Sequence, residues 1–548
     1  MLLANGIMLV VVLNLLADRY FFRLDLTEEK RYSLKEPTMD LLSQLDDDVY
    51  IEVFLAGELN AGFTRFQKSM EETLTEFRIA SGNRIQYAFT DPQSAMSQKA
   101  QGEFIGELVS KGITPMNVID NRGGQRSERL VFPGVIIHYG GFEKGVMLLK
   151  GNRGGNSDQV INQSIEGLEY ELANTIYQLV NSDRKRIGLL NGNGELDSLL
   201  IASFNNALLD RYDVFKVDLR RKKQIENYDL LIILKPVEAF STLDKFKLDQ
   251  YVMRGGRLLL LLDRMDAVMD SASRQDYFAF PYELNLDDLL FRYGIRINPD
   301  LIQDRVSARF PVVTGMIGNR PQMTPMDWPF FPLINQYAVH PITRNLDASL
   351  LRFTCSLDTV KAEGIIKTPL MFTSPNARRL GAPVRVSVND LRSNADPLQF
   401  QSGLIPVGYL LEGKFSSLFE DRFLPAGAED EEIIERSDPT QIIVVSDGDL
   451  ARNEVNPRSG QPQQLGFDPV SSYTFANQDL LLNMVAFLME EGLINVRSKE
   501  VKLRPLNKNK VEEERLYWQI LNLVAPIVLL VVYGIVRAVL RKRKFTKP

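Results

Sequence analysis

The stretch RIGLLNGNGELD, residues Arg186–Asp197, decides the fold of the middle of this chain. A short apolar run ends in a loop of glycine and asparagine, and a segment with helical spacing follows. A strand, a glycine-rich loop and a helix in this order are typical of a parallel α/β sheet, in which nucleotide-binding proteins place their phosphate loop. The stretch therefore raises the question of whether the chain binds and hydrolyses a nucleotide.

The loop lacks the residues that phosphate-binding loops require. A P-loop reads G-x-x-x-x-G-K-[ST], because its lysine and hydroxyl meet the phosphates and Mg²⁺, and residues 192–197 contain no lysine. The dinucleotide fingerprint G-x-G-x-x-G fails at its last position, which is Asp197, and Glu195 adds negative charge where a phosphate would lie. We therefore expect a chain that does not hydrolyse ATP, is not an enzyme and needs no cofactor.

Apolar runs and helical segments alternate through the rest of this region. Tyr228–Lys235 and Arg257–Asp263 are typical of buried parallel strands, and a further strand begins the segment Gln441–Glu454. Helices are predicted over Ser198–Tyr212, Ser241–Gly256 and Asn477–Gly492. This alternation predicts a doubly wound parallel sheet of the α/β class.

Another α/β unit precedes this sheet. A strand, a helix with apolar spacing, a second strand, a hairpin and a closing helix follow one another along the chain. These elements cover Val49–Gly57, Phe63–Ser81, Arg84–Pro92, Phe132–Leu149 and Ser164–Val180. Their order predicts a thioredoxin-like unit, and because the unit has no C-x-x-C motif, thiol redox chemistry is excluded.

The pattern loosens between residues 270 and 439, where prolines are frequent. We interpret this segment as an ordered loop or strand-edge insertion with exposed aromatic side chains, Trp328, Phe330 and Phe331 among them. Exposed apolar patches mark partner-binding sites, so these three residues are candidates for docking a partner. The alternative is that a long loop packs its aromatic side chains onto the core.

Both ends of the chain carry apolar segments long enough for a membrane. Residues 1–17 are uncharged, and we interpret them as an uncleaved anchor because a signal peptide would have a basic start and a small-residue cleavage site. Residues 517–540 hold one charge, Arg537, and the basic run 541–544 follows, which predicts a cytoplasmic C-terminus. Two spans place both termini on one side of the inner membrane and the large domain in the periplasm.

These patterns divide the chain into consecutive parts. They are a transmembrane helix (1–17), a juxtamembrane segment (18–46), the thioredoxin-like unit (47–181), an α/β domain (182–498) with the insertion 270–439, a juxtamembrane linker (499–516), a transmembrane helix (517–540) and a basic tail (541–548).

Polar residues follow three of the predicted parallel strands. They are Asn191, Asn193, Glu195, Asp263, Asp447 and Asp449. Ligands of doubly wound sheets bind beyond the carboxyl ends of the strands, so these residues are a candidate site for a polar ligand or a cation. The alternative is that asparagine and aspartate follow strands because they form turns and cap the next helix.

Other chemistry finds little support in the sequence. The two histidines, His138 and His340, stand in a strand-like run and beside a proline, where packing or surface roles are expected. The single cysteine, Cys355, lies in an apolar run and is expected to pack there, and no pair of histidines has metal-ligand spacing. The formal net charge of −6 argues against a general nucleic-acid binder.

Several stretches together resemble the GldG family, the gliding-motility-associated ABC transporter auxiliary proteins of Bacteroidota. They are RLDLTEEKRYSL (23–34), GLLNGNGELD (188–197), LDQYVMRGGRLLLLLD (248–263), WPFFPL and HPITRNL (328–346), and NQDLLLNMVAFLMEEGLINVRSKEVKLRPL (477–506). The resemblance covers nearly the whole chain. It departs from the family pattern at the start, where the basic residues before the first span are missing.

The resemblance implies a function and partners. The segment 182–498 would be an auxiliary ABC-transport domain, related to glutamine-amidotransferase-like folds that lack the nucleophile. The chain would be an auxiliary or substrate-binding subunit, with a GldF-like permease and a GldA-like cytoplasmic ATPase as partners; a homodimer also stays open. Two alternatives remain: a periplasmic mechanical linker, or an anchored enzyme acting on glycans or peptides through paired carboxylates.

Overall fold

The computed structural model describes residues 8, 33–94, 98–120, 127–149, 157–181, 184–269, 272, 277–318, 320–388, 391, 396–428, 432–489, 496 and 514–545. The chain forms two compact units, residues 1–499 and 500–548, and each is described by itself. The predicted N-terminal span, residues 1–17, lies outside the described residues apart from Met8. The predicted domain boundaries stay predictions.

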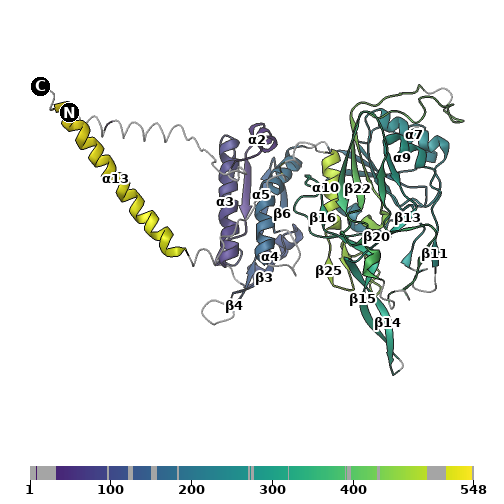
Figure 1. Cartoon of the computed structure of the whole chain (residues 1–548), viewed down its shortest axis with the longest axis horizontal. Coiled ribbons are helices and arrows are strands. Elements are labelled where there is room, and N and C mark those ends of the chain that lie inside the picture. Colours follow the sequence, from purple (N-terminus) through teal and green to yellow (C-terminus); the bar gives the residue numbers. More distant parts are fainter. Residues whose placement is uncertain are drawn as a thin grey trace. The chain divides into compact units, whose positions relative to one another are not determined.

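The first part of the chain builds a four-stranded mixed sheet in the order β2-β1-β5-β6 (Figure 1). β1 (Val49–Val53) pairs in parallel with β2 (Ile85–Phe89) and antiparallel with β5 (Gly134–Tyr139). β5 continues into β6 (Phe142–Met147) as an antiparallel hairpin. The predicted strands and hairpin of this part are therefore confirmed.

The helix α3 (Ala61–Ala80) covers this sheet through one apolar face. Its buried side chains are Phe63, Phe66, Met70, Leu74 and Phe77, spaced at three or four residues as the sequence predicts. Asn60 caps the helix, since its side chain accepts a hydrogen bond from the Phe63 N–H at 2.9 Å. α5 (Ser157–Val180) lies beside α3 and shares its core. The remaining elements here are α2 (Glu36–Ser43), α4 (Gln98–Ser110), β3 (Met116–Asp120) and β4 (Ser127–Val131).

The larger sheet has eight strands in the order β16-β19-β22-β23-β10-β9-β7-β8. Their bounds are β7 Arg186–Leu190, β8 Asp213–Val217, β9 Leu230–Leu234, β10 Arg257–Leu261, β23 Thr440–Val445, β22 Pro406–Gly413, β19 Ile365–Phe372 and β16 Gln336–Tyr337. The last five strands in the spatial order are parallel, and the first three add an antiparallel edge. The predicted parallel sheet is present, with a mixed edge that the sequence did not indicate.

Helices cover both faces of this sheet, because alternate residues of each buried strand point to opposite faces. In β10, Leu258 and Leu260 join one core, and Leu259 and Leu261 join the other. α7 (Thr242–Met253) and α9 (Asp287–Tyr293) pack into the first core, and α6 (Ala202–Leu209) and α10 (Asn477–Met489) pack into the second.

The ends of these helices differ in how well the sequence predicts them. Ser241 caps α7 as expected, since its side chain accepts a hydrogen bond from the Asp244 N–H at 3.0 Å, and Gly255 follows the helix with a φ of +83°. The helix α6 begins four residues later than expected. The reason is a separate turn at Asp197, whose carbonyl accepts the N–H groups of Leu200 and Ile201.

The proline-rich segment forms strands rather than a loop. β14 (Ser307–Ile317) and β15 (Arg320–Ile334) pair as a long antiparallel hairpin, which extends away from the larger sheet in Figure 1. A proline lacks an N–H but keeps its carbonyl, so it can still accept a hydrogen bond there, as Pro332 does from the Leu351 N–H at 3.0 Å. The short elements of this region are β11 (Tyr277–Ala279), β12 (Ile295–Ile297), β13 (Asp300–Asp304), β17 (Ser349–Leu350), β18 (Leu357–Thr359), β20 (Ala377–Gly381), β21 (Val384–Val386) and η4 (Pro397–Gln399). The short strands β24 (Phe467–Asp468) and β25 (Tyr473–Thr474) follow β23.

The expectation that Trp328, Phe330 and Phe331 are exposed is wrong, although other aromatic side chains of the segment, such as Phe280, are exposed. Trp328, Phe330 and Phe331 are 1%, 2% and 6% exposed. Phe353 packs against the rings of Phe330 and Phe331, with centroids 5.9 and 5.3 Å apart. The three residues at the root of the hairpin belong to the core, so they are unavailable for docking a partner in this conformation.

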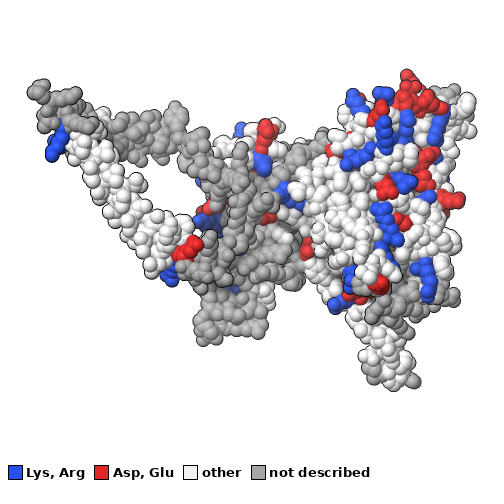
Figure 2. Space-filling model, in the orientation of Figure 1, with Lys and Arg blue, Asp and Glu red and all other residues white. Residues whose placement is uncertain are grey.

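The second unit contains one long helix, α13 (Arg515–Phe545). Among the described residues it is the one helix long and apolar enough to cross a membrane, over Arg515–Lys542. Figure 2 shows its middle without charged side chains, which gather at its two ends. Pro526 lies inside the helix. The predicted span 517–540 falls within this helix, so an apolar C-terminal segment suited to membrane anchoring is present.

Candidate functional site

The carboxyl ends of the parallel strands bring part of the predicted site together. Asp263 follows β10, and Asp447 and Asp449 follow β23, which is the neighbouring strand. These three aspartates meet around Lys235, which follows β9 on the other side of β10. We call these four residues the lysine–aspartate cluster.

The ammonium of Lys235 lies among the carboxylates of the cluster. Lys235 Nζ is 2.5 Å from Asp449 Oδ2 and 2.9 Å from Asp263 Oδ2. All four side chains are buried. A cation supplied by the chain therefore occupies the position that a bound cation would take between two carboxylates.

The backbone of the turn after β23 completes the cluster. Asp263 Oδ1 accepts the Gly448 N–H at 2.5 Å, and Asp447 Oδ1 accepts the Asp449 N–H at 2.7 Å. These bonds hold the short 3₁₀ turn η5 (Gly448–Ala451) against the end of β10. Gly448 must be a glycine here, because a Cβ added to it would lie 2.5 Å from Lys235 Cβ.

Lys235 itself adopts a strained backbone conformation. Its φ is +51°, in the left-handed region that side-chain-bearing residues rarely adopt, at a cost of order 1–3 kcal/mol. The conformation turns the chain sharply at the end of the apolar strand β9 and directs the ammonium toward the two neighbouring strand ends. The ion pairs of the cluster offset this strain.

The cluster shifts the pKa values of its members in opposite directions. Burial lowers the pKa of Lys235, but the charges of Asp263 and Asp449 outweigh burial and raise it above its usual value. Burial raises the pKa of Asp449, but the charges of Lys235 and Arg452 bring it below its usual value. Burial, together with the charges of Asp263 and Asp449, raises the pKa of Asp447 well above the ordinary range. Burial also raises the pKa of Asp263, although the charge of Lys235 opposes this. Among the three carboxyl groups, only that of Asp449 therefore has its pKa below the usual value.

Arg352 connects the cluster to its surroundings. Its backbone N–H donates to Asp447 Oδ2 at 2.5 Å, and its guanidinium donates to Glu454 Oε1 at 2.6 Å. The guanidinium also lies 5.3 Å from the ring centre of Phe331, which is a cation–π distance. The aromatic residues of the hairpin root therefore support the polar cluster rather than a partner.

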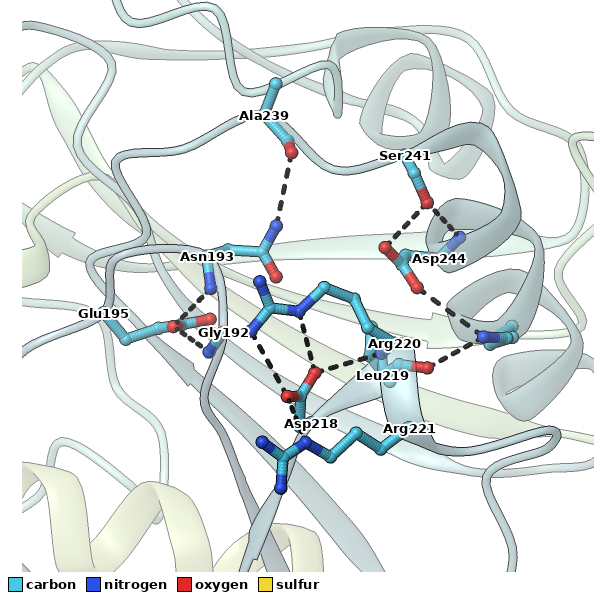
Figure 3. A network of polar contacts seen from close by, with 11 residues as sticks. Gly192, Asn193, Glu195, Asp218, Leu219, Arg220, Arg221, Ala239, Ser241 and Asp244 are labelled. Atoms are coloured by element: carbon cyan, nitrogen blue, oxygen red, sulfur yellow. Dashed lines mark hydrogen bonds and ion pairs between the residues drawn. The ribbon is translucent and has the colours of Figure 1, made fainter.

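The other three predicted site residues lie in the glycine loop after β7. The carboxylate of Glu195 accepts the backbone N–H groups of Gly192 and Asn193, both at 2.8 Å (Figure 3). Asn193 is buried and donates its side-chain amide to the Ala239 carbonyl at 3.3 Å. Asn191 is exposed, and its backbone N–H donates to the Val217 carbonyl. Two adjacent N–H groups, which a phosphate loop would offer to an anion, here bind the chain's own carboxylate.

A second ion pair borders this loop. Arg220 Nε donates to Asp218 Oδ1 at 3.0 Å, directly after β8, and the same carboxylate caps the turn η2 (Leu219–Arg221) (Figure 3). The hydrogen bond from Arg220 lowers the pKa of Asp218. A Cβ added to Gly192, whose φ is +140°, would lie 2.8 Å from the Arg220 guanidinium. Glycine is therefore needed where this arginine crosses the loop.

The structure separates the six predicted residues into two groups. Asp263, Asp447 and Asp449 form one buried cluster with Lys235, and Asn191, Asn193 and Glu195 belong to the loop after β7. The residues that sequence reasoning missed are Lys235, Arg352, Asp218 and Arg220. Lys235 and Asp218 each stand directly after a predicted or observed strand, which is the signal that could have found them. Whether either group binds a ligand stays a prediction.

His340 packs against an aromatic side chain, and Cys355 is buried. His340 lies against Phe487 with ring centres 4.9 Å apart, and burial lowers its pKa. Cys355 is buried as expected, which raises the pKa of its thiol well above the ordinary value. Within the described ranges, no group of three or more His, Cys, Asp or Glu side chains is arranged to hold a metal ion.

All eight strands of the larger sheet lie within the residues that a known protein family matches. A family model described as an ABC-type uncharacterized transport system matches residues 184–484, which is more than half of the chain. The chain belongs to this family. It is accordingly an auxiliary protein of an ABC transport system, whose other components are its partners. A second family model, described as a domain of unknown function, matches residues 28–138.

A curated relative of this ABC transport auxiliary protein aligns over more of the chain than the family model does. An uncharacterized protein of Borreliella burgdorferi is 23% identical over 537 residues, covering 95% of this chain and 94% of that protein. Among solved structures, the mmIFT52 N-terminal domain is 12% identical with a TM-score of 0.31, covering 55% of this chain and 97% of that one. PurLQS from Thermotoga maritima is 9% identical with a TM-score of 0.24, covering 56% of this chain and 100% of that one.

The substitution Lys235→Met tests the lysine–aspartate cluster. Removing the ammonium leaves buried carboxylates without their cation, so we expect a loss of about 3–5 kcal/mol in the free energy of unfolding at neutral pH. Without the ammonium the folded-state pKa values of Asp263 and Asp449 lie above their unfolded values. Their contribution to stability is then lost as the pH rises, so the loss is larger at pH 8 than at pH 5.

Denaturant-induced unfolding, followed by the change in tryptophan fluorescence as the buried Trp328 becomes exposed to water, measures this loss. The matched control is Lys361→Met, because Lys361 is exposed and its replacement should change stability by less than about 0.5 kcal/mol. Equal losses for the two variants, or a loss for Lys235→Met that does not depend on pH, would contradict the ion-pair interpretation.

The substitution Glu195→Ala tests the glycine loop. It leaves the N–H groups of Gly192 and Asn193 without their acceptor, so we expect a loss of roughly 1–3 kcal/mol. If the two N–H groups form an anion site, added acetate should stabilise the Glu195→Ala chain more than the wild type. Unfolding in acetate and in chloride at equal ionic strength measures the difference. The control Glu238→Ala, an exposed neighbour, should show no acetate effect; the same absence in Glu195→Ala would rule out the anion site.

Proposed function

We propose that this chain is a membrane-anchored, non-catalytic subunit of an ABC transporter of the kind associated with gliding motility, with a coupling or substrate-binding role. The family match over residues 184–484 carries the proposal. The apolar helix α13 supports the anchoring. The absence of a usable phosphate loop in the sequence 192–197 supports a subunit whose energy comes from a separate ATPase.

The polar residues at the strand ends support a role without chemistry. Lys235 stands where a cation would sit, and Glu195 stands where an anion would sit, so both positions are filled by side chains of the chain itself. A catalytic acid or base must reach its substrate, whereas Asp263 and Asp447 are 1% and 0% exposed. Binding or coupling, rather than catalysis, is the function that these contacts favour.

The architecture favours two known fold types within this proposal. The strand order β2-β1-β5-β6, with one parallel and two antiparallel pairings, supports a thioredoxin-like unit. Five parallel strands with helices on both faces support a glutamine-amidotransferase-like domain. The first has no C-x-x-C motif, and the single Cys355 of the second is buried. Both folds are thus proposed as binding scaffolds.

We also propose an orientation of the chain in the membrane and two partners. Residues 1–17 form a second span, the body between the spans lies in the periplasm, and the basic run 541–544 lies in the cytoplasm. The partners are a GldF-like permease in the membrane and a GldA-like ATPase on its cytoplasmic side. Energy from ATP then reaches the periplasmic body through the permease and the spans.

Purification of the affinity-tagged chain from its native membrane tests the partnership. We expect a polytopic permease and a P-loop ATPase to co-elute in mild detergent, and ATP hydrolysis in the eluate to depend on that ATPase. A chain ending at residue 514, which lacks α13, is the matched control and should lose the permease. A full-length chain that elutes alone, or that hydrolyses ATP when isolated, would overturn the proposal.

Labelling with a membrane-impermeant maleimide tests the orientation. The native Cys355 is buried, so a cysteine introduced at an exposed position is the one that reacts. In intact spheroplasts we expect Lys68→Cys, on the exposed side of α3, to be labelled, and Lys547→Cys, in the tail, to be labelled only after lysis. The reverse pattern would place the body in the cytoplasm and refute the orientation.

A further inference from the structure

One face of the hairpin β14–β15 is apolar along its outer part and open to solvent. Residues that pair in an antiparallel hairpin point to the same face, and alternate residues of a strand point to opposite faces. The register therefore places six apolar residues on one face, which we call the apolar face: Pro311, Val313, Met316, Pro321, Met323 and Pro325. Val313, Met316 and Met323 are 39%, 64% and 53% exposed, and the hairpin that carries them extends away from the larger sheet (Figure 1).

The opposite face of the same hairpin is polar in its outer part. The hydroxyl oxygens of Thr314 and Thr324 share a hydrogen bond at 2.7 Å, and Gln322 lies on the same side of β15 as Thr324. Toward the base this side turns into the core, where the ring centres of Phe310 and Trp328 lie 6.1 Å apart. The hairpin is therefore amphipathic, and the side that packs into the core is not the apolar face.

Charge is nearly absent from the outer part of the hairpin. Between Pro311 and Met326 the sequence contains one charged residue, Arg320. The ion pair between Arg309 Nε and Asp327 Oδ1, at 3.3 Å, marks the base of the apolar face. Exposed apolar surface marks contact sites, and a charged partner surface would lose its water here without gaining an opposite charge. The partner surface that fits the apolar face is itself apolar and uncharged.

The backbone of the hairpin disfavours an added strand and a lipid bilayer as occupants. Pro311 and Pro325 pair with each other, and Pro321 is the third proline of the face, so an added strand would lack hydrogen-bond donors at these three positions. Two paired prolines exchange no N–H bonds, so their carbonyls point outward from the hairpin. Hydrocarbon offers these carbonyls no donor. A protein groove that is lined by apolar side chains and has donors at its rim satisfies both the face and the carbonyls.

The size of the apolar face indicates how its partner is held. At the usual strand rise and spacing the face measures about 17 Å by 10 Å, or roughly 170 Å². A stable interface covers about 800 Å² on each partner, so two copies of the chain that met through this face alone would separate. A protein anchored in the same membrane meets the face at a high effective concentration, at which a small contact suffices. The apolar helix α13 is suited to hold this chain in that membrane.

We propose that the apolar face docks into an apolar, uncharged groove of the permease subunit that shares the membrane with this chain. This docking rests on the proposed function and names the surface through which the folded body contacts the permease. Methionine suits such a contact, because its flexible thioether side chain adapts to an irregular partner surface. The contact adds to the anchoring by α13 and does not replace it.

A pair of double variants tests the apolar face against the polar face. Met316→Asp with Met323→Asp places two charges on the apolar face, and Thr314→Asp with Gln322→Asp places two charges on the polar face. Burying a charge without a partner weakens a contact, so we expect the first pair to reduce the co-eluting permease at least about tenfold and the second to leave it within about twofold. The two double variants should have similar Tm values, since all four side chains are exposed.

Photo-crosslinking in native membranes identifies the occupant without adding charge. The substitution Met323→benzoylphenylalanine probes the apolar face, and Gln322→benzoylphenylalanine, at the adjacent residue on the polar face, is its control. We expect irradiation to join the permease to position 323 and not to position 322. A crosslink from position 323 to a second copy of the chain, a crosslink to lipid alone, or no crosslink while the permease still co-elutes would overturn the docking role of the apolar face.

Co-elution with the wild type separates the two levels of the proposal. A wild-type chain that elutes without a permease overturns the proposed function, and the docking role with it. A permease that co-elutes with the wild type and equally with both double variants leaves the proposed function standing and overturns the docking role alone.

Discussion

The ion pairs of Lys235 with Asp263 and Asp449 are the interaction on which the larger sheet depends. They tie together the ends of three adjacent parallel strands: β9 and β10, which follow one another in the sequence, and β23, which lies far along the chain from both. Between β10 and β23 the chain makes the whole excursion that includes the hairpin β14–β15. Hydrophobic burial holds these strands in the core but does not distinguish one register from another at their ends, whereas a single ammonium between specific carboxylates does.

The sequence predicts the parallel part of this arrangement well. Fully apolar runs such as Leu230–Leu234 and Arg257–Leu261 have no other stable place than a sheet that is covered on both faces, and the structure puts both at its centre. The convergence of Asp263 with Asp447 and Asp449 also follows from parallel strand order. Lys235 was missed because it closes an apolar run and reads as the polar boundary of a strand. The role of Lys235 depends on its left-handed φ and on which strands lie beside β9, and the residues around Lys235 in the sequence indicate neither.

The prolines around Trp328 explain why the sequence predicts exposed aromatic side chains where the structure buries them. Proline disfavours central strands, so a segment that contains Pro325, Pro329 and Pro332 reads as a loop with exposed rings. In the folded chain these prolines lie on the hairpin strand β15, and the rings beside them pack against Phe310 and Phe353 in the core. Tertiary packing thus overrides the local preference. The six predicted polar residues form two groups because β9 lies between β7 and β10 in the sheet. It separates the loop after β7 from the ends of β10 and β23.

Pro526 gives the helix α13 a property that matters only inside a bilayer. Proline has no N–H, so it cannot donate to the carbonyl of Asn522 one turn earlier, and the amide side chain of Asn522 lies at the same level. Hydrocarbon offers neither group a hydrogen bond, and each unsatisfied polar group there costs several kcal/mol. A second helix that presents a hydroxyl or amide at this depth would satisfy both groups. If α13 spans a membrane, as proposed, these two groups favour its lateral association with another helix over a solitary position among lipid chains.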